Sequence, residues 1–199
     1  YSNCYDYDVT SFYPAIILNC KLGSLIFRHI YNQIFDQRVS FKETNDQRAD
    51  ALKLILNSIY GKLKSEYSDE RIFAPHIALN ICLNGQLYIL DLIEKVSHCN
   101  ILLANTDGII TEKPIPQEIL DEFMTRTKFK LGTKRINKLI LRDSNAYYAE
   151  YEGGKTKELN CFRQDQSYMH NTRAPVIAKA AIAQLKDNIP VEFTIRNHQ

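Results

Sequence analysis

A short stretch over residues 101–112, which reads ILLANTDGIITE, places the strongest constraint on how this chain can fold. Two apolar runs flank the sequence NTDG, and an Asp-Gly step between β-prone runs is typical of a β-hairpin. Both runs are apolar throughout, so we expect a covered sheet from which the hairpin tip emerges. Asp107 would then be a carboxylate on a rigid support, although Asp also precedes Gly in turns for conformational reasons alone.

The 199 residues have an ordinary globular composition, 45% hydrophobic and 24% charged, and can bury a sizeable core. The net charge of +2 neither demands nor excludes a nucleic-acid partner. We expect no membrane span, because no apolar run approaches the roughly 18 residues that a span requires. The five cysteines form no close pair, which favours a reducing, cytoplasmic compartment over a disulfide framework or a zinc site. The chain lacks an initiating methionine, so we expect it to be a piece of a longer protein.

The N-terminal segment predicts a strand followed directly by a helix. Residues 5–9 alternate like a strand, and Pro14 is acceptable in the first turn of the helix that follows. Asp8 would therefore lie at a strand end, beside a helix start. The backbone N–H groups of Ser11 and Phe12 would be free to bind an anion. The alternative is a capped helix with a solvated Asp.

Two helices are predicted over about 31–43 and 47–65, with a reversal near residues 44–46 that folds them against each other. Arg38 and Lys42 share a face of the first helix, and Lys53 and Asn57 share a face of the second. In an antiparallel pair, Arg38 and Lys53 would lie at the same level. Three cations and an amide could then converge on one anion, whereas the alternative is a solvated charged face.

Gly61 lies where the second helix should still continue, at a cost of ~1 kcal/mol relative to Ala. This indicates a close approach by another backbone or by a ligand. A further helix over 75–96, with Gly85 as a close-packing point and apolar residues including Leu83, Leu87 and Leu90, should cover the sheet. The remaining expected elements are a helix over 116–129, strands from 139, a hairpin over 145–162 and a helix over 175–185.

Three segments, in chain order, resemble the polymerase motifs of family B DNA polymerases, particularly those of phage type. They read DVTSFYP at 8–14, KLILNSIYG at 53–61 and NTDG at 105–108. The second motif is highly specific, the first is specific and the third is degenerate. The resemblance extends to the end of the chain.

The resemblance implies an α+β fold with an antiparallel palm sheet backed by helices, a short antiparallel two-helix fingers insertion and the beginning of a helical thumb. It implies a palm at 1–30 and 70–165, fingers at 31–69 and the start of the thumb at 166–199. It further implies a template-directed DNA polymerase that adds deoxynucleotides to a primer 3′ end by two-metal nucleotidyl transfer. Its partners would be primer–template DNA and deoxynucleoside triphosphates, and a phage-encoded enzyme would act in the host cytoplasm.

The resemblance also assigns roles to residues in each motif. Asp8 and Asp107 would be the catalytic carboxylates and, with the backbone carbonyl of Val9, would hold two Mg²⁺ ions, for which Mn²⁺ could substitute. Residues that match nucleotide-binding positions of the family are Ser11, Phe12, Tyr13, Arg38, Lys42, Lys53, Asn57, Tyr60 and Gly61. Within this set, Tyr13 matches the sugar-selecting residue of the family. Tyr60 and Gly61 would line the nascent base pair.

The chain departs from the family pattern at two places. Asn105 and Gly108 replace the first Asp and the Ser of the common Asp-Thr-Asp-Ser motif, whereas Asp107 is kept. The primer-contacting Lys-Lys-Arg-Tyr-like motif is replaced near 143–147, so other groups must hold the primer. The alternatives are a catalytically incompetent, polymerase-like nucleic-acid-binding fragment, another two-metal palm enzyme, and a structural domain without this chemistry. Activity of the chain by itself is a separate question, because the duplex would be held mainly by other parts of the enzyme.

Overall fold

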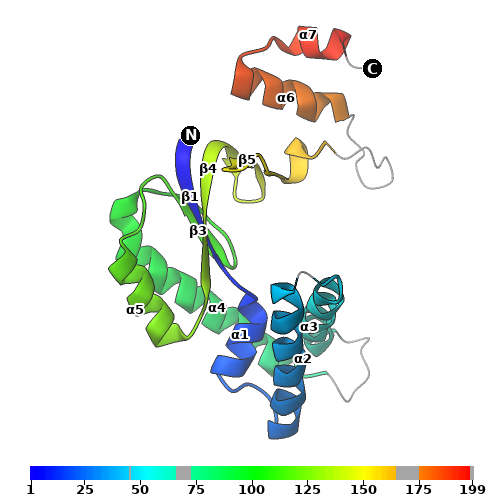
Figure 1. Ribbon diagram of the computed structural model, residues 1–199, viewed down its shortest axis with the longest axis vertical. Coiled ribbons are helices and arrows are strands. Elements are labelled where there is room, and N and C mark those ends of the chain that lie inside the picture. Colours follow the sequence, from blue (N-terminus) through cyan, green and yellow to red (C-terminus); the bar gives the residue numbers. More distant parts are fainter. Residues whose placement is uncertain (45, 66–72, 165–174, 198–199) are drawn as a thin grey trace. The chain divides into compact units, whose positions relative to one another are not determined.

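The structure is a computed structural model that describes residues 1–44, 46–65, 73–164 and 175–197. Within these ranges it has an α+β architecture with one six-stranded sheet and seven α-helices (Figure 1). The chain forms two compact units. The sheet unit comprises Tyr1–Asp8, Val96–Pro116 and Gly132–Gln199, and the helical unit comprises Val9–Lys95 and Gln117–Leu131. The expected end of the fingers and beginning of the thumb, at 66–69 and 166–174, lie outside the described residues.

The N-terminal strand lies in the middle of the sheet, whose strand order is β2-β3-β1-β4-β5-β6. The strands are β1 (Ser2–Val9), β2 (Ile101–Ala104), β3 (Gly108–Thr111), β4 (Leu131–Asp143), β5 (Ala146–Tyr151) and β6 (Thr156–Glu158). The pairs β2–β3, β4–β5 and β5–β6 are antiparallel neighbours. Both expected hairpins are confirmed, while β4 begins eight residues before the expected strand start at 139.

The core of the sheet unit is built from side chains of five strands. It contains Cys4, Leu103, Ile110, Ile136, Leu139, Tyr147, Ala149 and Tyr151. A smaller cluster joins Tyr148 of β5 to Phe162 and to Ile182 of α6 (Pro175–Asp187). The helix α6 confirms the expected closing helix, and a further short helix, α7 (Val191–Arg196), follows it. All four residues of β3 are buried, as the apolar sequence predicts.

The helical unit contains α1 (Phe12–Asn19), α2 (Leu25–Glu43), α3 (Arg48–Lys64), α4 (Pro75–Val96) and α5 (Gln117–Thr127). The helix α2 begins six residues earlier than expected, because the Ser24 hydroxyl accepts a hydrogen bond of 3.2 Å from the Phe27 amide and caps the helix. The Tyr31 hydroxyl of α2 donates to the carbonyl of Leu56 on α3 at 3.3 Å. This contact confirms that the two helices fold back on each other.

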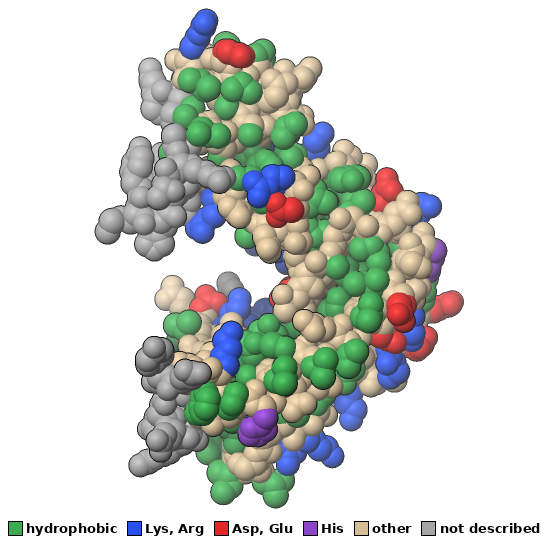
Figure 2. Space-filling view, turned by 180° about the vertical axis from the view of Figure 1, so that it is seen from behind, with side chains coloured by type: hydrophobic (Ala, Val, Ile, Leu, Met, Phe, Trp, Pro, Cys, Tyr) green, Lys and Arg blue, Asp and Glu red, His purple; other side chains and the backbone are tan. Residues whose placement is uncertain are grey.

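The helix α4 packs closely at Gly85 but does not bury the face that its sequence indicates. A Cβ atom at Gly85 would lie 3.0 Å from the Phe12 ring, which confirms the expected close-packing point. Hydrophobic side chains are visible at the surface of the molecule (Figure 2). Those of α4 include Leu79, Leu83, Leu87 and Leu90, which are at least 49% exposed. The expectation that Leu83, Leu87 and Leu90 belong to the buried face of this helix is therefore wrong, because α4 buries Ala78, Ile81, Ile89 and Leu92 instead.

One helical segment, Pro75–Cys99, reaches the length and hydropathy of a membrane span. It has 25 residues and a mean hydropathy of 1.2, and 28% of its most apolar window is buried. The core helix of a soluble protein passes the same test, so this feature is weak evidence for a span. The expectation that no segment approaches such a length was nevertheless too strong.

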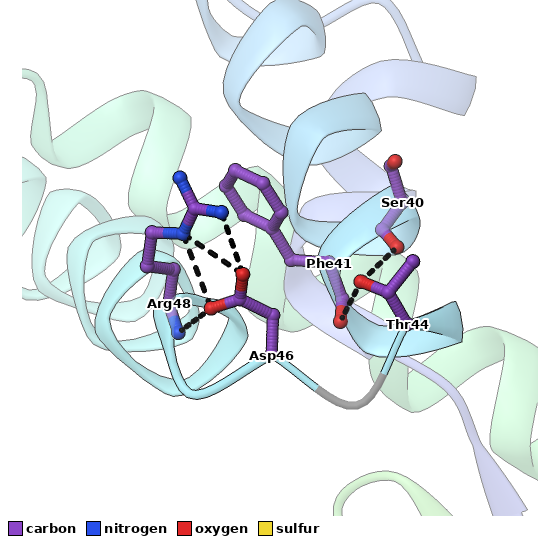
Figure 3. A network of polar contacts seen from close by, with 5 residues as sticks. All are labelled: Ser40, Phe41, Thr44, Asp46 and Arg48. Carbon is purple, nitrogen blue, oxygen red and sulfur yellow. Dashed lines mark hydrogen bonds and ion pairs between the residues drawn. The ribbon is translucent and has the colours of Figure 1, made fainter.

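The reversal between α2 and α3 is held by a local network of polar contacts (Figure 3). The Arg48 side chain pairs with the carboxylate of Asp46 at 2.6 Å, and its guanidinium lies 4.1 Å from the ring centroid of Phe41. The hydrogen bonds from Arg48 lower the pKa of Asp46. The Thr44 hydroxyl donates to the carbonyl of Phe41 at 3.2 Å. These contacts tie the last turn of α2 to the first turn of α3.

Candidate active site

The two acidic residues of the first and third motifs are positioned by two neighbouring strands of the sheet. The antiparallel pairing of β1 and β3 sets Asp8 opposite Gly108, and Asp107 comes directly before Gly108. The tip of the β2–β3 hairpin is closed by a hydrogen bond of 2.8 Å from the Asn105 amide to the Gly108 carbonyl. The sheet therefore brings the segments that carry Asp8 and Asp107 together, although they are 99 positions apart in the chain.

Gly108 is required for the close approach of β1 and β3. A Cβ atom at this position would lie 2.4 Å from the carbonyl oxygen of Tyr7 and 3.1 Å from the Cα atom of Asp8. Gly108 is the first residue of β3 and does not adopt the positive φ of a turn glycine. The hairpin prediction was right, but the physical reason for this glycine is strand packing.

The electrostatics of the site show that its carboxylates interact. Burial raises the pKa of Asp8 above its usual range, and the negative charges of Asp107 and Asp6 raise it further. The cations Lys157 and Lys134 act in the opposite direction. Asp107 itself is exposed at the hairpin tip. The ionised form of Asp8 is therefore less favourable than that of a free aspartate.

Several neighbours of Asp8 were not singled out from the sequence. The Tyr151 hydroxyl donates to the buried carboxylate of Asp6 at 2.7 Å, and burial together with this bond raises the pKa of Tyr151. The Lys134 ammonium lies 5.6 Å from the ring centroid of Tyr151, and the Lys157 ammonium lies 5.4 Å from that of Tyr147. These residues lie on β4, β5 and β6, which follow β1 in the sheet order. No sequence motif marks them, so only the sheet order could have indicated them.

The protein groups available to a metal ion here are oxygen atoms. Among the described residues there is no cluster of three or more His, Cys, Asp and Glu side chains that could hold an ion. Asp8 and Asp107 are hard carboxylate donors of the kind that Mg²⁺ prefers, and their mutual repulsion would be relieved by a cation. The residues present thus fit a divalent ion that takes its other ligands from substrate and water.

In the helical unit, the first motif contacts the first helix of the pair through a buried arginine. Arg38 is only 8% exposed, and its Nη1 donates to the Ser11 hydroxyl. Ser11 precedes α1 with φ 56° and ψ 49°, a left-handed conformation that is unfavourable for a residue with a Cβ atom. The Ser11 hydroxyl accepts the hydrogen bond from Arg38 and makes no hydrogen bond that caps α1. Strained backbone held by a buried cation is a feature of functional sites.

The first and second motifs also meet through two tyrosines. The rings of Tyr13 and Tyr60 have centroids 4.4 Å apart, with an interplanar angle of 30°. The Tyr60 hydroxyl lies 2.8 Å from the Cys82 sulfur, and burial followed by this contact raises the pKa of Tyr60. The sequence predicted that both tyrosines contact the nucleotide, but it did not predict that they contact each other.

The remaining predicted site residues are dispersed over the helical unit. Lys42, Lys53 and Asn57 are exposed, while Val9 and the Phe12 side chain are buried. The Phe12 ring packs edge-on against Phe129 at 5.5 Å, so only its backbone could face a ligand. The convergence of Arg38 and Lys53 on one anion stays a prediction.

Gly61 has open space beside it. A Cβ atom there would meet no protein atom within 4 Å, so the expected close approach by another backbone is absent from the described residues. The other expectation for this glycine, a close approach by a ligand, stays a prediction.

The fold of this chain is similar to that of part of a DNA polymerase. Among solved structures, it is similar to the family B DNA polymerase from the hyperthermophilic archaeon Pyrobaculum calidifontis, with a TM-score of 0.61 and 11% sequence identity. The match covers 100% of this chain and 33% of that chain, so the chain spans about a third of the length of the archaeal polymerase. No protein-family model and no curated protein sequence matches the chain.

Proposed function

We propose that the chain is the catalytic part of a template-directed DNA polymerase, which adds deoxynucleotides to the 3′ end of a primer. The observation that carries the proposal is the pairing of Asp8 with Gly108 in a polymerase-like fold. This pairing sets two interacting carboxylates near each other, Asp8 on β1 and Asp107 directly before β3. The order of the three motifs in the sequence supports it. In this proposal the sheet belongs to the palm, α2 and α3 form the fingers, and α6 begins the thumb.

The carboxylates would hold the divalent ions. Asp8 and Asp107, with the backbone carbonyl of Val9, would bind Mg²⁺, which when bound supplies charge neutralisation and activates a hydroxyl nucleophile. In the reaction, the primer 3′ oxygen bonds to the α-phosphorus of the nucleotide, and the bond to the bridging oxygen of the β-phosphate breaks. The hydroxyl proton is released and pyrophosphate leaves. Tyr151, through its hydrogen bond to Asp6, would keep that neighbouring carboxylate from competing for the ions.

The helical unit would bind the incoming nucleotide. Arg38, Lys42 and Lys53 would neutralise and position the triphosphate, and Asn57 would add a hydrogen bond. The N–H groups of Ser11 and Phe12 would complete the phosphate site. Tyr13 would exclude a ribose 2′-hydroxyl, and its contact with Tyr60 at 4.4 Å would hold its ring in one orientation. Tyr60 and Gly61 would line the new base pair.

The experiment that tests the proposal is primer extension on a defined template. The complete protein that contains this chain should extend a primer with the nucleotides that the template specifies, in the presence of Mg²⁺ and not in excess chelator. If the complete protein binds the duplex but never extends it, the chain is a nucleic-acid-binding fragment and the proposal is wrong.

We expect Lys53→Ala to weaken nucleotide use without harming the fold. Lys53 is exposed on α3, so its removal leaves the core intact and removes one cation from the triphosphate. The apparent KM for nucleotide in steady-state extension should rise by about tenfold, which corresponds to the loss of about 1.4 kcal/mol.

Lys62→Ala is the matched control, because Lys62 is also exposed on α3 but is not among the predicted nucleotide ligands. An equal KM for the Lys53→Ala variant and the unmodified chain would remove α3 from the nucleotide site.

A further inference from the structure

A pocket of about 410 Å³ lies within the helical unit, between α1, α2 and the segment that follows α5. Its cations are Arg38, Lys42, Lys128 and Lys130, and Glu43 is its single acidic lining residue. The lining therefore carries a net charge of +3, because four cations face one carboxylate. A volume of this size is sufficient for a small organic ligand.

The pocket also has an apolar wall. Ala15 and Leu18 of α1 and Phe35 and Val39 of α2 form this wall. A site for a bare inorganic anion has no need of such a surface, whereas an anion with an apolar body would use both parts. The charge and the wall together indicate an amphipathic anion.

A buried arginine in the lining has unused hydrogen-bonding capacity. Arg38 is 92% buried, and its Nε has no hydrogen-bond partner within the part of the chain that the structure describes. Leaving a charged donor buried and unsatisfied is unfavourable, by more than for a neutral group. A ligand oxygen that accepted from this guanidinium would remove that cost.

The two lysines that the motifs do not include are held in place by backbone contacts. Lys128 has φ 58° and its amide donates to the Met124 carbonyl at 2.8 Å, which ends α5 with a left-handed residue. The carbonyl of Lys130 accepts a hydrogen bond of 2.8 Å from the Thr10 amide. The segment that carries both lysines is thus fixed against the residues before α1.

We propose that this pocket binds a phosphomonoester with an apolar body, of the size of a nucleoside monophosphate, whose phosphate is held by Arg38, Lys128 and Lys130. The apolar body lies against the wall formed by α1 and α2. The pocket shares Ser11, Arg38 and Lys42 with the proposed site of the incoming nucleotide. It differs from that site because Lys128 and Lys130 line it, whereas Lys53 and Asn57 of α3 do not.

Calorimetric titration of the full chain with adenosine 5′-monophosphate, without Mg²⁺ and without DNA, tests the proposal. The unmodified chain should bind it, and Lys130→Ala and Lys128→Asn should each weaken binding by about tenfold. Ala15→Leu, which fills the wall and keeps helix propensity, should weaken binding to a similar extent. Thermal unfolding of each variant verifies that it is folded.

The controls separate this site from the proposed polymerase site. Lys53→Ala and Lys62→Ala should bind adenosine 5′-monophosphate as the unmodified chain does, whereas Lys53→Ala alone should impair nucleotide use. Inorganic pyrophosphate and adenosine should each bind more weakly than the monophosphate. The proposal is overturned if the monophosphate does not bind, if Lys130→Ala and Ala15→Leu both retain full binding, or if pyrophosphate binds equally well.

Discussion

Asp107→Ala is expected to abolish primer extension while the chain stays folded. The side chain is exposed at the hairpin tip, so its removal costs no packing, but it removes one of the two carboxylates proposed to hold the metal ions. Loss of several kcal/mol of charge stabilisation corresponds to a rate lower by roughly 10³-fold or more. Single-turnover extension at saturating nucleotide and Mg²⁺ measures this rate.

Thr106→Ala is the matched control for this change, since it truncates the adjacent exposed residue of the same hairpin and leaves both carboxylates in place. It should extend primers at the normal rate, and Asp107→Asn should be as inactive as Asp107→Ala. Retained extension by either Asp107 variant would contradict the assignment of this residue.

Gly108→Ala should produce the largest loss of stability among the single substitutions considered for the sheet. The added methyl group would lie 2.4 Å from the Tyr7 carbonyl oxygen, which is a backbone atom, so β1 and β3 must separate to admit it. Overpacking of this kind costs roughly 1–3 kcal/mol. We expect a melting temperature lower by several degrees in calorimetry, together with impaired extension, because the same shift displaces Asp8.

A Gly→Ala change at Gly61 is a control with the opposite expected effect on the melting temperature. A Cβ atom there meets no protein atom within 4 Å, and alanine is favoured over glycine inside a helix by ~1 kcal/mol. Gly61→Ala should therefore raise the melting temperature. If Gly108→Ala instead unfolded at the same temperature as the unmodified chain, the close approach of β1 and β3 would be ruled out.

Much of the secondary structure follows from local sequence, and the exceptions have local causes. The hairpins around NTDG and Gly153-Gly154 and the helices α3, α4 and α6 were predicted within a few residues. The start of β4 was missed because its first residues, LGTKR, are mostly polar and partly or fully exposed and lack the alternation of a half-buried strand. The helix α4 carries leucines on two faces, so the buried face could not be chosen from periodicity.

The site residues that lie in sequence motifs could be predicted. The contacts between segments far apart in the sequence could not. Asp8 and Asp107 could be singled out because their motifs resemble those of a known family. The bond from Tyr151 to Asp6 and the contact of Arg38 with Ser11 join residues far apart in sequence. No motif marks Lys128 and Lys130, and only the folded chain sets them beside α1.

The central position of β1 has a consequence for the order in which the chain is completed during its synthesis. The residue that pairs with Asp8 follows 100 positions later in the chain. At 5–20 residues per second, β1 must wait about 5–20 s for β3, and longer for β4 on its other side. During that interval both of its edges are unpaired and able to join other strands. Truncated products that end before residue 108 should therefore be the most aggregation-prone forms of this protein.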